Sequence, residues 1–223
     1  MTTQSTCNIC NGNDFTEGPL GRLSLSGKKP TCTSCGSLER HRILRTAWSL
    51  ISINHLRKKK ALQFSSDPSV DKTWFRELEI STYGYKNSID IQNIDRKDAH
   101  YDIVICNQIL EHVADDKTAF AELMRILKPN GFLQMTVPNP IMRQTTEDWG
   151  YPKEDFHGHY RHYGLDLIEY FQAVTPSIYM ICVKASDEIT GTQDYVFFWT
   201  QNQETKEYLI DCFSGHLEIA HSI

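Results

Sequence analysis

The chain has 223 residues, of which 40% are hydrophobic and 23% are charged, and its formal net charge is −5 at pH 7. These totals are ordinary for a soluble globular protein, and they allow one α/β domain with a full core plus a small appendage. The acidic balance disfavours a general nucleic-acid binder, which usually has a basic surface. Residues 1–13 hold no apolar signal segment, and no run of about 18 apolar residues occurs, so we expect a cytoplasmic protein with no membrane partner.

Four of the seven cysteines form two pairs near the start of the chain. Cys7 and Cys10 are two residues apart, Cys32 and Cys35 are spaced in the same way, and 21 residues separate the pairs. In a reducing compartment such pairs indicate metal ligands rather than disulfides. A redox pair or a chance spacing is the alternative interpretation. Four cysteines complete a tetrahedral Zn²⁺ site with no open position, so we predict a structural zinc ribbon over residues 1–37.

Residues 38–223 are expected to form one further domain of alternating strands and helices. A helix is predicted to start at Ser37, which can cap it, with Glu39 in its first turn. The next expected elements, in chain order, are a strand at 61–65, the end of a helix at 74–78, weak strands at 79–83 and 88–91, and an apolar strand at 101–106. A helix then begins at Asp115 and ends before Lys128-Pro129-Asn130-Gly131, and the last elements are a strand at 132–137, a helix at 164–173 and strands at 177–183 and 195–200.

Strands separated by helices predict a parallel, doubly wound sheet. The two consecutive strands at the end predict an antiparallel edge on that sheet. The expected fold class is therefore α/β.

The middle of the chain carries a series of motifs in order. The strand opened by Tyr101-Asp102 leads into Leu110-Glu111-His112-Val113, and a helix ends in Arg125-Ile126-Leu127-Lys128-Pro129-Asn130-Gly131 before the next strand. This series resembles class I methyltransferases, which depend on S-adenosylmethionine. The segment from Cys32 to Arg42 is similar to the second cysteine pair and first helix of methyltransferases with a zinc ribbon. The resemblance implies a Rossmann-like seven-stranded methyltransferase sheet, with S-adenosyl-L-methionine and structural Zn²⁺ as cofactors.

The resemblance also implies where the cofactor binds, because ligands of open parallel sheets lie at the carboxyl ends of the strands. In the zinc-ribbon group the first strand often ends in an apolar-Pro-Glu turn. Here Asp67 matches the acid and Ser66 replaces the proline, and no glycine-rich loop is present. The residues assigned to the cofactor are Phe64, Ser65, Ser66, Asp67, Tyr83, Asp90, Ile91, Asn107, Gln108 and His112.

The loop from Phe156 to Gly164 resembles a family segment that carries His-x-Arg-x-Tyr-Gly. His159 and Arg161 fall on its matching positions. We assign His159 as the first candidate for a general base and His112 as the second, because the unperturbed pKa of histidine is near neutrality. Arg161 is expected to pair with an anionic group of the substrate. The alternatives are a structural lid or a metal site made by His157, His159 and His162.

The resemblance implies methylation of a small-molecule acceptor on oxygen or nitrogen, with a sugar or another specialised metabolite as the acceptor class. A degenerate methyltransferase-like binding or scaffold protein is the first alternative, since the motifs of the first strands are weak. A methyltransferase of RNA or protein that uses the ribbon for substrate contact is the second, and the acidic total disfavours nucleic acid. The sequence does not match a dehydrogenase, because no dinucleotide-binding motif follows the first strand. No residue pattern selects the acceptor atom or an oligomeric state.

Overall fold

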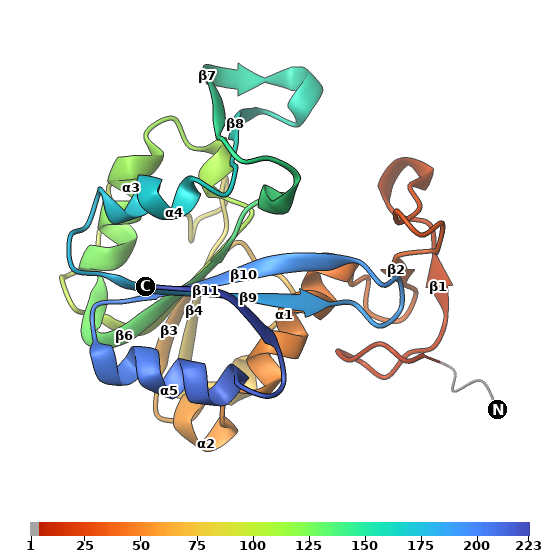
Figure 1. Ribbon diagram of the computed structural model, residues 1–223, viewed down its shortest axis with the longest axis horizontal. Coiled ribbons are helices and arrows are strands. Elements are labelled where there is room, and N and C mark those ends of the chain that lie inside the picture. The colour runs from red at the N-terminus through yellow and green to blue at the C-terminus, as the bar shows by residue number, and fades with distance from the viewer. Residues whose placement is uncertain (1–4) are drawn as a thin grey trace.

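The computed structural model describes residues 5–223 and places a seven-stranded sheet at the centre of the molecule (Figure 1). The strand order is β11-β9-β10-β6-β5-β3-β4. These strands are β3 (Lys60–Phe64), β4 (Glu77–Ser81), β5 (Tyr101–Asn107), β6 (Leu127–Thr136), β9 (Tyr179–Ser186), β10 (Gln193–Thr200) and β11 (Glu218–Ser222). Neighbours among β3 to β6 are parallel, whereas β10 and β11 pair antiparallel with their neighbours. The predicted Rossmann-like α/β sheet with an antiparallel edge is confirmed.

Helices cover both faces of the sheet (Figure 1). One face carries α1 (Glu39–Ser49), α2 (Ile53–Leu56) and α5 (Gln203–Phe213), and the other carries α3 (Asp116–Arg125) and α4 (Leu167–Gln172). On the first face the fully buried Trp48 packs its ring 5.9 Å from that of Phe132. On the second face Phe120 stacks on Phe171 with 4.5 Å between ring centroids. Each amphipathic helix therefore buries its apolar side against one face of the sheet.

The Lys128-Pro129-Asn130-Gly131 motif brings β6 beside β5. A Cβ atom on Gly131 would lie 2.6 Å from the carbonyl oxygen of Asp102, which only glycine avoids at this position. Lys128 Nζ lies 3.0 Å from Asp102 Oδ2 and joins the same two strands. The helix before the motif starts as predicted, because Asp115 accepts a hydrogen bond from the Thr118 backbone N–H at 2.9 Å.

Two predicted elements between β3 and β5 are wrong. The segment 74–78 does not end a helix, because Lys60 to Phe64 pairs in register with Glu77 to Ser81 and draws this stretch into β4. Residues 88–91 form a loop rather than a strand. There the Ser81 hydroxyl accepts from the Ile89 N–H at 2.9 Å and the Asn87 amide donates to the Ile80 carbonyl at 2.7 Å. Such side-chain bonds occupy backbone groups that a strand would need.

The seventh strand lies at the edge of the sheet beside β9. It is β11, which follows α5, and the sequence patterns predicted neither element. The predicted helix at 164–173 is the shorter α4, and the predicted final strands are β9 and β10 with shifted ends.

The predicted cap of the first helix is also wrong. Leu38 is the capping residue of α1, and the imidazole of His41 accepts from its backbone N–H at 3.1 Å. Ser37 is instead turned toward the cysteines, with its Oγ 3.4 Å from Cys7 Sγ and 3.2 Å from Cys35 Sγ.

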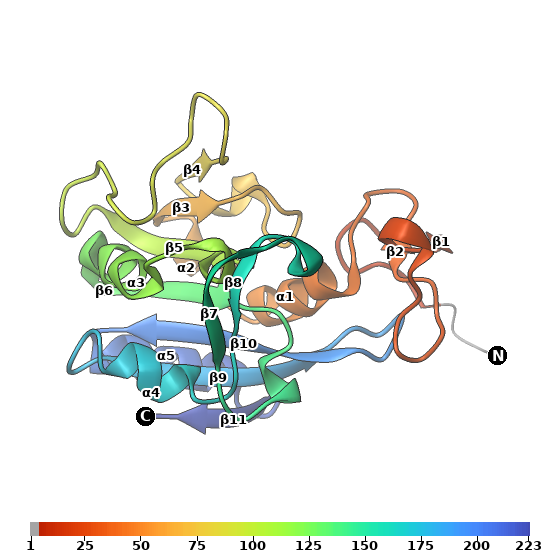
Figure 2. The same ribbon diagram turned by 90° about the horizontal axis from the view of Figure 1, so that it is seen from above.

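Two small antiparallel pairs lie outside the central sheet. The pair β1 (Phe15–Thr16) and β2 (Thr31–Cys32) belongs to the N-terminal segment, which lies beyond the end of α1 (Figure 2). The pair β7 (Glu147–Lys153) and β8 (His159–His162) forms a hairpin between β6 and α4. Short 3-10 helices occur at Pro19–Gly21, Lys72–Trp74, Leu110–His112, Pro140–Met142 and Glu154–Phe156. The division of the chain into domains at residues 37 and 38 stays a prediction.

Within residues 5–223, no helix has both the length and the apolar character that crossing a membrane requires.

Candidate active site and four-cysteine cluster

The carboxyl ends of β3 and β5 lie side by side at one end of the sheet. Phe64 is the register partner of Cys106, so the residues after these strands emerge together. Ser65 and Gln108 each follow a strand end and have φ angles of 62° and 55°. Residues other than glycine rarely adopt this left-handed region, and such strain of about 1–3 kcal/mol per residue clusters at functional sites. The two turns thus mark the crevice in which a ligand of this fold class binds.

A buried polar network holds the floor of this crevice. The Asn107 side-chain oxygen accepts from Gln134 Nε2 at 2.8 Å and from Thr136 Oγ1 at 3.0 Å. Its amide nitrogen lies 3.3 Å from Asp67 Oδ2 and donates to it. The other carboxylate oxygen of Asp67 accepts from the Ser69 N–H at 2.8 Å. The network therefore fixes Asp67, which was predicted to contact the cofactor, at the ends of β3, β5 and β6.

Sequence reasoning missed Gln134 as a member of this network. It is fully buried on β6, where its side-chain oxygen also lies 3.3 Å from Trp48 Nε1. The sequence feature that could have revealed it is a glutamine in the middle of an otherwise apolar strand. A buried amide needs hydrogen-bond partners, so such a glutamine indicates a polar network.

The predicted cofactor residues of the loop after β4 differ in their exposure to solvent and in whether they line a hollow. Tyr83 is 95% exposed. Asp90 is exposed too, but it lines a hollow of about 490 Å³ together with Ile80, Ile89 and Arg96. Ile91 is buried in the core. The structure therefore brings Asp90, and not Tyr83, to a hollow beside β4, and the cofactor roles of these residues stay predictions.

Two histidines meet beside the crevice. His112 comes from the 3-10 helix after β5 and His159 from β8, and their ring centroids are 4.5 Å apart at an interplanar angle of 89°. His159 is 9% exposed, and its Nδ1 atom is buried with no hydrogen-bond partner in the described residues. Burial lowers the pKa of His159 to about 4 and lowers that of His112 below its ordinary value. Both imidazoles are therefore neutral at neutral pH, and each offers a lone pair.

Glu111 lies beside the two histidines and is fully buried. Neither of its carboxylate oxygens has a hydrogen-bond partner in residues 5–223, and burial raises its pKa to about 8. One ligand atom from each of Glu111, His112 and His159 lies within 4.8 Å of the others. The predicted alternative of a site made by His157, His159 and His162 is corrected here, because neither His157 nor His162 belongs to the group that the structure assembles.

Arg161 does not point to a substrate, which corrects the predicted role of this residue. Its side chain is 3% exposed, and its Nε lies 2.8 Å from Asp148 Oδ2. Its terminal nitrogens donate to the backbone carbonyls of Leu110, Val113 and Ala114. These bonds use the guanidinium within the protein, and they fasten β8 to the turn that carries Glu111 and His112.

The last glycine of the His-rich motif is required by close packing. A Cβ atom on Gly164 would lie 2.6 Å from the backbone nitrogen of Thr145. The hydroxyl of Thr146 accepts from the Gly164 N–H at 3.1 Å. Gly164, after β8, thus packs closely against Thr145 and Thr146, before β7, and this contact closes the base of the hairpin.

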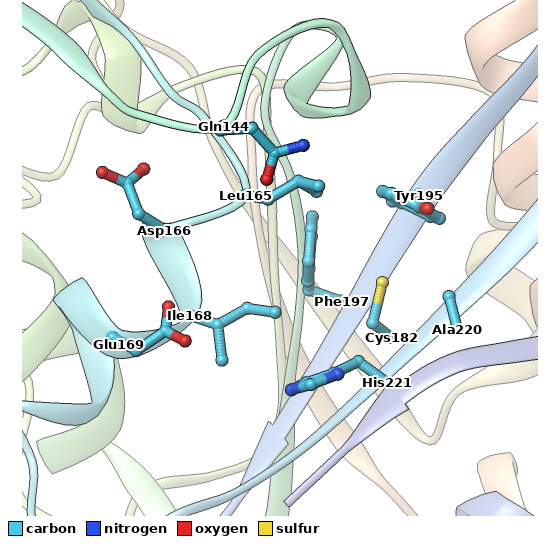
Figure 3. Close-up of a pocket in the computed structure, with 10 residues that line it drawn as sticks. All are labelled: Gln144, Leu165, Asp166, Ile168, Glu169, Cys182, Tyr195, Phe197, Ala220 and His221. Atoms are coloured by element: carbon cyan, nitrogen blue, oxygen red, sulfur yellow. The ribbon is translucent and has the colours of Figure 1, made fainter.

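A second hollow, of about 410 Å³, lies apart from these groups (Figure 3). Its lining comes from α4 and the antiparallel strands, and it includes Asp166, Cys182, Tyr195 and His221. Asp166 is occupied by hydrogen bonds from the backbone N–H and hydroxyl of Thr146. None of the predicted site residues lines this hollow.

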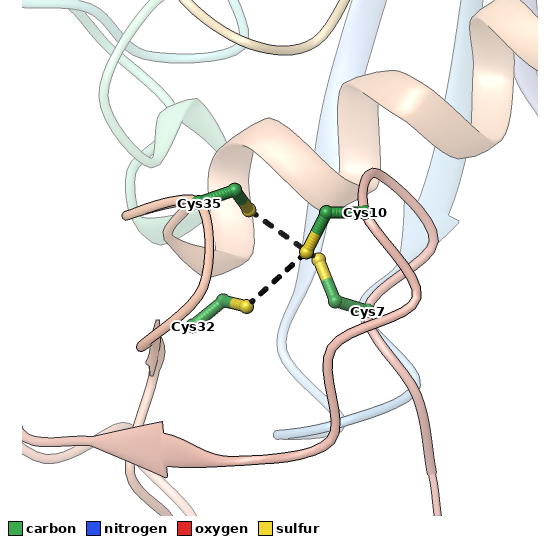
Figure 4. Close-up of side chains that lie close together, drawn as sticks. All are labelled: Cys7, Cys10, Cys32 and Cys35. Atoms are coloured by element: carbon green, nitrogen blue, oxygen red, sulfur yellow. Dashed lines mark hydrogen bonds between the residues drawn. The ribbon is translucent and has the colours of Figure 1, made fainter.

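The four cysteines of the N-terminal segment converge on one point (Figure 4). Cys7 and Cys35 have their sulfurs 3.8 Å apart, and those of Cys10 and Cys32 are 3.6 Å apart. All four cysteines are free thiols. A tetrahedral Zn²⁺ with Zn–S bonds of about 2.3 Å requires sulfurs separated by about 3.8 Å. The cluster therefore has the size and donor set that zinc needs.

A comparison with protein families identifies the central part of the chain. Residues 76–135 match the family profile described as a methyltransferase domain. This part of the chain is similar to a methyltransferase domain. The match includes β4, β5, the turn with Glu111 and His112, and α3. The predicted class, an S-adenosylmethionine-dependent methyltransferase, is confirmed.

The chain is also similar to solved structures of methyltransferases, at low sequence identity. One is 1,6-didemethyltoxoflavin-N1-methyltransferase of Burkholderia thailandensis with bound 1,6-didemethyltoxoflavin and S-adenosylhomocysteine, at 14% identity and a TM-score of 0.49, covering 70% of this chain and 77% of that one. Another is an S-adenosylmethionine-dependent methyltransferase of Thermotoga maritima, at 13% identity and a TM-score of 0.41, covering 73% and 91%. No curated protein matches the sequence significantly.

Proposed function

We propose that this protein transfers a methyl group from S-adenosylmethionine to an oxygen or nitrogen atom of a small-molecule acceptor. The observation that carries the proposal is the methyltransferase-domain match over residues 76–135, which contains the turn at the carboxyl end of β5. A sugar or another specialised metabolite is the acceptor class we favour, on the resemblance of the sequence to methyltransferases with a zinc ribbon.

Methyl transfer is an in-line displacement, and the protein contributes mainly by aligning the reacting atoms. The cofactor supplies the electrophilic methyl group on its sulfonium sulfur. Asp67, Asn107 and Gln108 stand at the strand ends where the cofactor of this fold class binds. His159 and His112 lie beside that crevice as neutral imidazoles, and either can accept the proton that the acceptor loses.

The charge distribution of the N-terminal segment supports a small acceptor over a nucleic acid. Arg22 pairs with Glu39 at 2.7 Å, and Arg42 pairs with Asp187 at 2.8 Å. A phosphate-binding surface needs cations that are free to reach the phosphates. Two arginines of the segment and of the adjoining helix are instead neutralised within the protein.

We further propose that the four-cysteine cluster binds one structural Zn²⁺. The sulfur separations of 3.6 Å and 3.8 Å support this assignment, and four thiolates leave no position for a substrate. The ion would join the loops that carry the two cysteine pairs.

Calorimetric titration of the zinc-loaded protein with S-adenosylmethionine and S-adenosylhomocysteine tests the proposed function. We expect micromolar binding of both. Asp67→Asn should weaken binding about 10-fold, since one charged hydrogen-bonding group is worth about 1.5 kcal/mol. Asp71→Asn is the matched control, because Asp71 is exposed and caps the short 3-10 helix that begins at Lys72. Absence of binding to either compound would favour the degenerate binding protein.

The base assignment has a test of its own. His159→Ala is expected to reduce turnover by about 100-fold or more while it changes cofactor affinity much less. Single-turnover rates on the accepted substrate measure the first quantity, and calorimetry measures the second. Unchanged turnover in this variant would remove His159 from the mechanism.

A further inference from the structure

Three buried polar atoms beside the crevice have no partner in the described part of the chain. They are the two carboxylate oxygens of Glu111 and the Nδ1 atom of His159. Glu111 is fully buried and His159 is 9% exposed. Buried polar groups are almost always hydrogen-bonded or bound to an ion, so a group without a protein partner is a candidate site for a water or an ion.

Protein donors do not satisfy this carboxylate, although the buried guanidinium of Arg161, on β8, donates to the turn that carries Glu111. Arg161 donates to Asp148 and to the carbonyls of Leu110 and Val113. His112 presents its ring to His159 at 4.5 Å between centroids. The carboxylate and the two imidazoles thus lie close together, and no side chain of residues 5–223 donates a hydrogen bond to the carboxylate.

We propose that Glu111, His112 and His159 form a second metal site, which takes a divalent transition-metal ion. One ligand atom of each residue already lies within 4.8 Å of the other two. Two imidazoles and one carboxylate suit ions such as Mn²⁺ and Fe²⁺, and three protein ligands leave coordination positions open. An ion held there would give the buried carboxylate of Glu111 a partner of opposite charge.

This site differs in chemistry from the four-cysteine cluster. Thiolates select soft or borderline ions such as Zn²⁺, whereas oxygen and nitrogen donors accept the harder Mn²⁺. The four-cysteine cluster would be closed, and the second site would be open toward the crevice. Mn²⁺ can therefore be used to examine the second site in protein that carries one equivalent of Zn²⁺, held by the four-cysteine cluster.

The open positions suggest a role at the acceptor, which rests on the proposed function. An acceptor hydroxyl bound to the ion would have a lowered pKa and would release its proton to solvent. Its oxygen would then bond to the methyl carbon, and the electron pair of the breaking C–S bond would stay on sulfur to give S-adenosylhomocysteine. In that arrangement His159 is a ligand in place of a base.

The metal site is tested by titrating zinc-loaded, otherwise metal-free protein with Mn²⁺ and following free Mn²⁺ by electron paramagnetic resonance. We expect one Mn²⁺ per chain. Glu111→Gln, which keeps the shape of the side chain, and His159→Ala should each weaken binding at least 10-fold. His157→Asn is the matched control, because His157 is an exposed histidine on the same hairpin and asparagine tolerates its φ of 58°. No binding by the wild type, or equal binding by Glu111→Gln, overturns the site.

A measurement on the wild type covers the case in which a variant fails to fold. Bound Mn²⁺ should broaden the imidazole NMR signals of His112 and His159 and leave those of His100 and His216 sharp. Broadening of all histidines alike, or of neither His112 nor His159, would place the ion elsewhere. Titration of the Mn²⁺-free protein with S-adenosylhomocysteine is a separate readout, so the metal site and the proposed function can fail independently.

Discussion

Arg42 and Asp187 form a buried ion pair that joins the first helix to the loop between β9 and β10. The Nε–Oδ1 distance is 2.8 Å, and each side chain is 1% exposed. The remaining donors of Arg42 reach the carbonyls of Ser37 and Pro30 at 2.9 Å and 2.8 Å. One arginine thus connects the N-terminal segment, α1 and the sheet.

Asp187→Asn should lower the free energy of unfolding at pH 7 by about 3–5 kcal/mol, because it leaves the buried guanidinium without its counter-charge. Chemical denaturation measures the difference. Arg22→Ala is the control, since Arg22 is 45% exposed in its pair with Glu39 and should cost about 1 kcal/mol or less. An equal decrease in the free energy of unfolding in the two variants would show that the buried pair stabilises the protein no more than the exposed one.

The same pair predicts a pH dependence. Burial alone would raise the pKa of Asp187, but hydrogen bonds from Arg42 and Thr190 hold that pKa below its ordinary value. A lowered folded-state pKa contributes stability above the unfolded-state pKa of about 4, and the contribution is lost as the pH falls through the folded-state pKa. The stability difference between wild type and Asp187→Asn should therefore narrow below about pH 4. Denaturation curves over an acid series would show a constant difference if this is wrong.

Cys32→Ser should abolish stoichiometric zinc and lower the melting temperature. The reason is that the cysteine pairs hold the loops on which Pro30 and Ser37 present their carbonyls to Arg42. Metal content by mass spectrometry and a thermal scan give the two readouts. Cys212→Ser is matched chemically and removes a half-buried thiol of α5 outside the cluster, so its zinc content should equal that of the wild type.

Gly164→Ala should cost about 1–3 kcal/mol of stability, because the added Cβ meets backbone atoms of Thr145 at 2.6 Å and the backbone must shift. Gly150→Asn is the control, which tests whether substitution of another glycine in this region lowers the stability as much. Gly150 has a φ of 74°, which asparagine tolerates, and a Cβ atom at this position would have no neighbouring atom within 4 Å. The second variant should change the free energy of unfolding by no more than about 0.5 kcal/mol.

Arg161→Ala should release the β7–β8 hairpin. It removes the hydrogen bonds from this side chain to Asp148, Leu110, Val113 and Ala114, and the Val113 and Ala114 carbonyls lose their arginine donor. We expect protease cleavage within residues 147–162 to accelerate at least 10-fold. Glu147→Ala, on the exposed side of the same hairpin, should leave the cleavage rate near that of the wild type. Cleavage at the wild-type rate in Arg161→Ala would show that other contacts hold the hairpin.

The sequence by itself determined the elements whose signals are local. The apolar run 101–106 and the Asp115 cap each depend on neighbouring residues, and each lies where it was predicted. The helix also ends before Lys128, but the predicted turn at 128–131 is wrong, because these residues already belong to strand β6. The cysteine pairs were readable for the same reason, because two-residue spacing is itself the geometry of a metal-binding turn.

Only the tertiary structure decided which groups meet and which are buried. Pairing with β3 moved the strand predicted at 79–83 to Glu77–Ser81. The hairpin fold carried Arg161 inward to backbone carbonyls rather than outward to a substrate. Folding likewise brings His159 to the buried Glu111 and to His112, which precede it by 48 and 47 positions. Sequence periodicity carries no information on such contacts. Desolvation and pairing depend on the full three-dimensional surroundings, so the chemistry of this site appears only once the chain is folded.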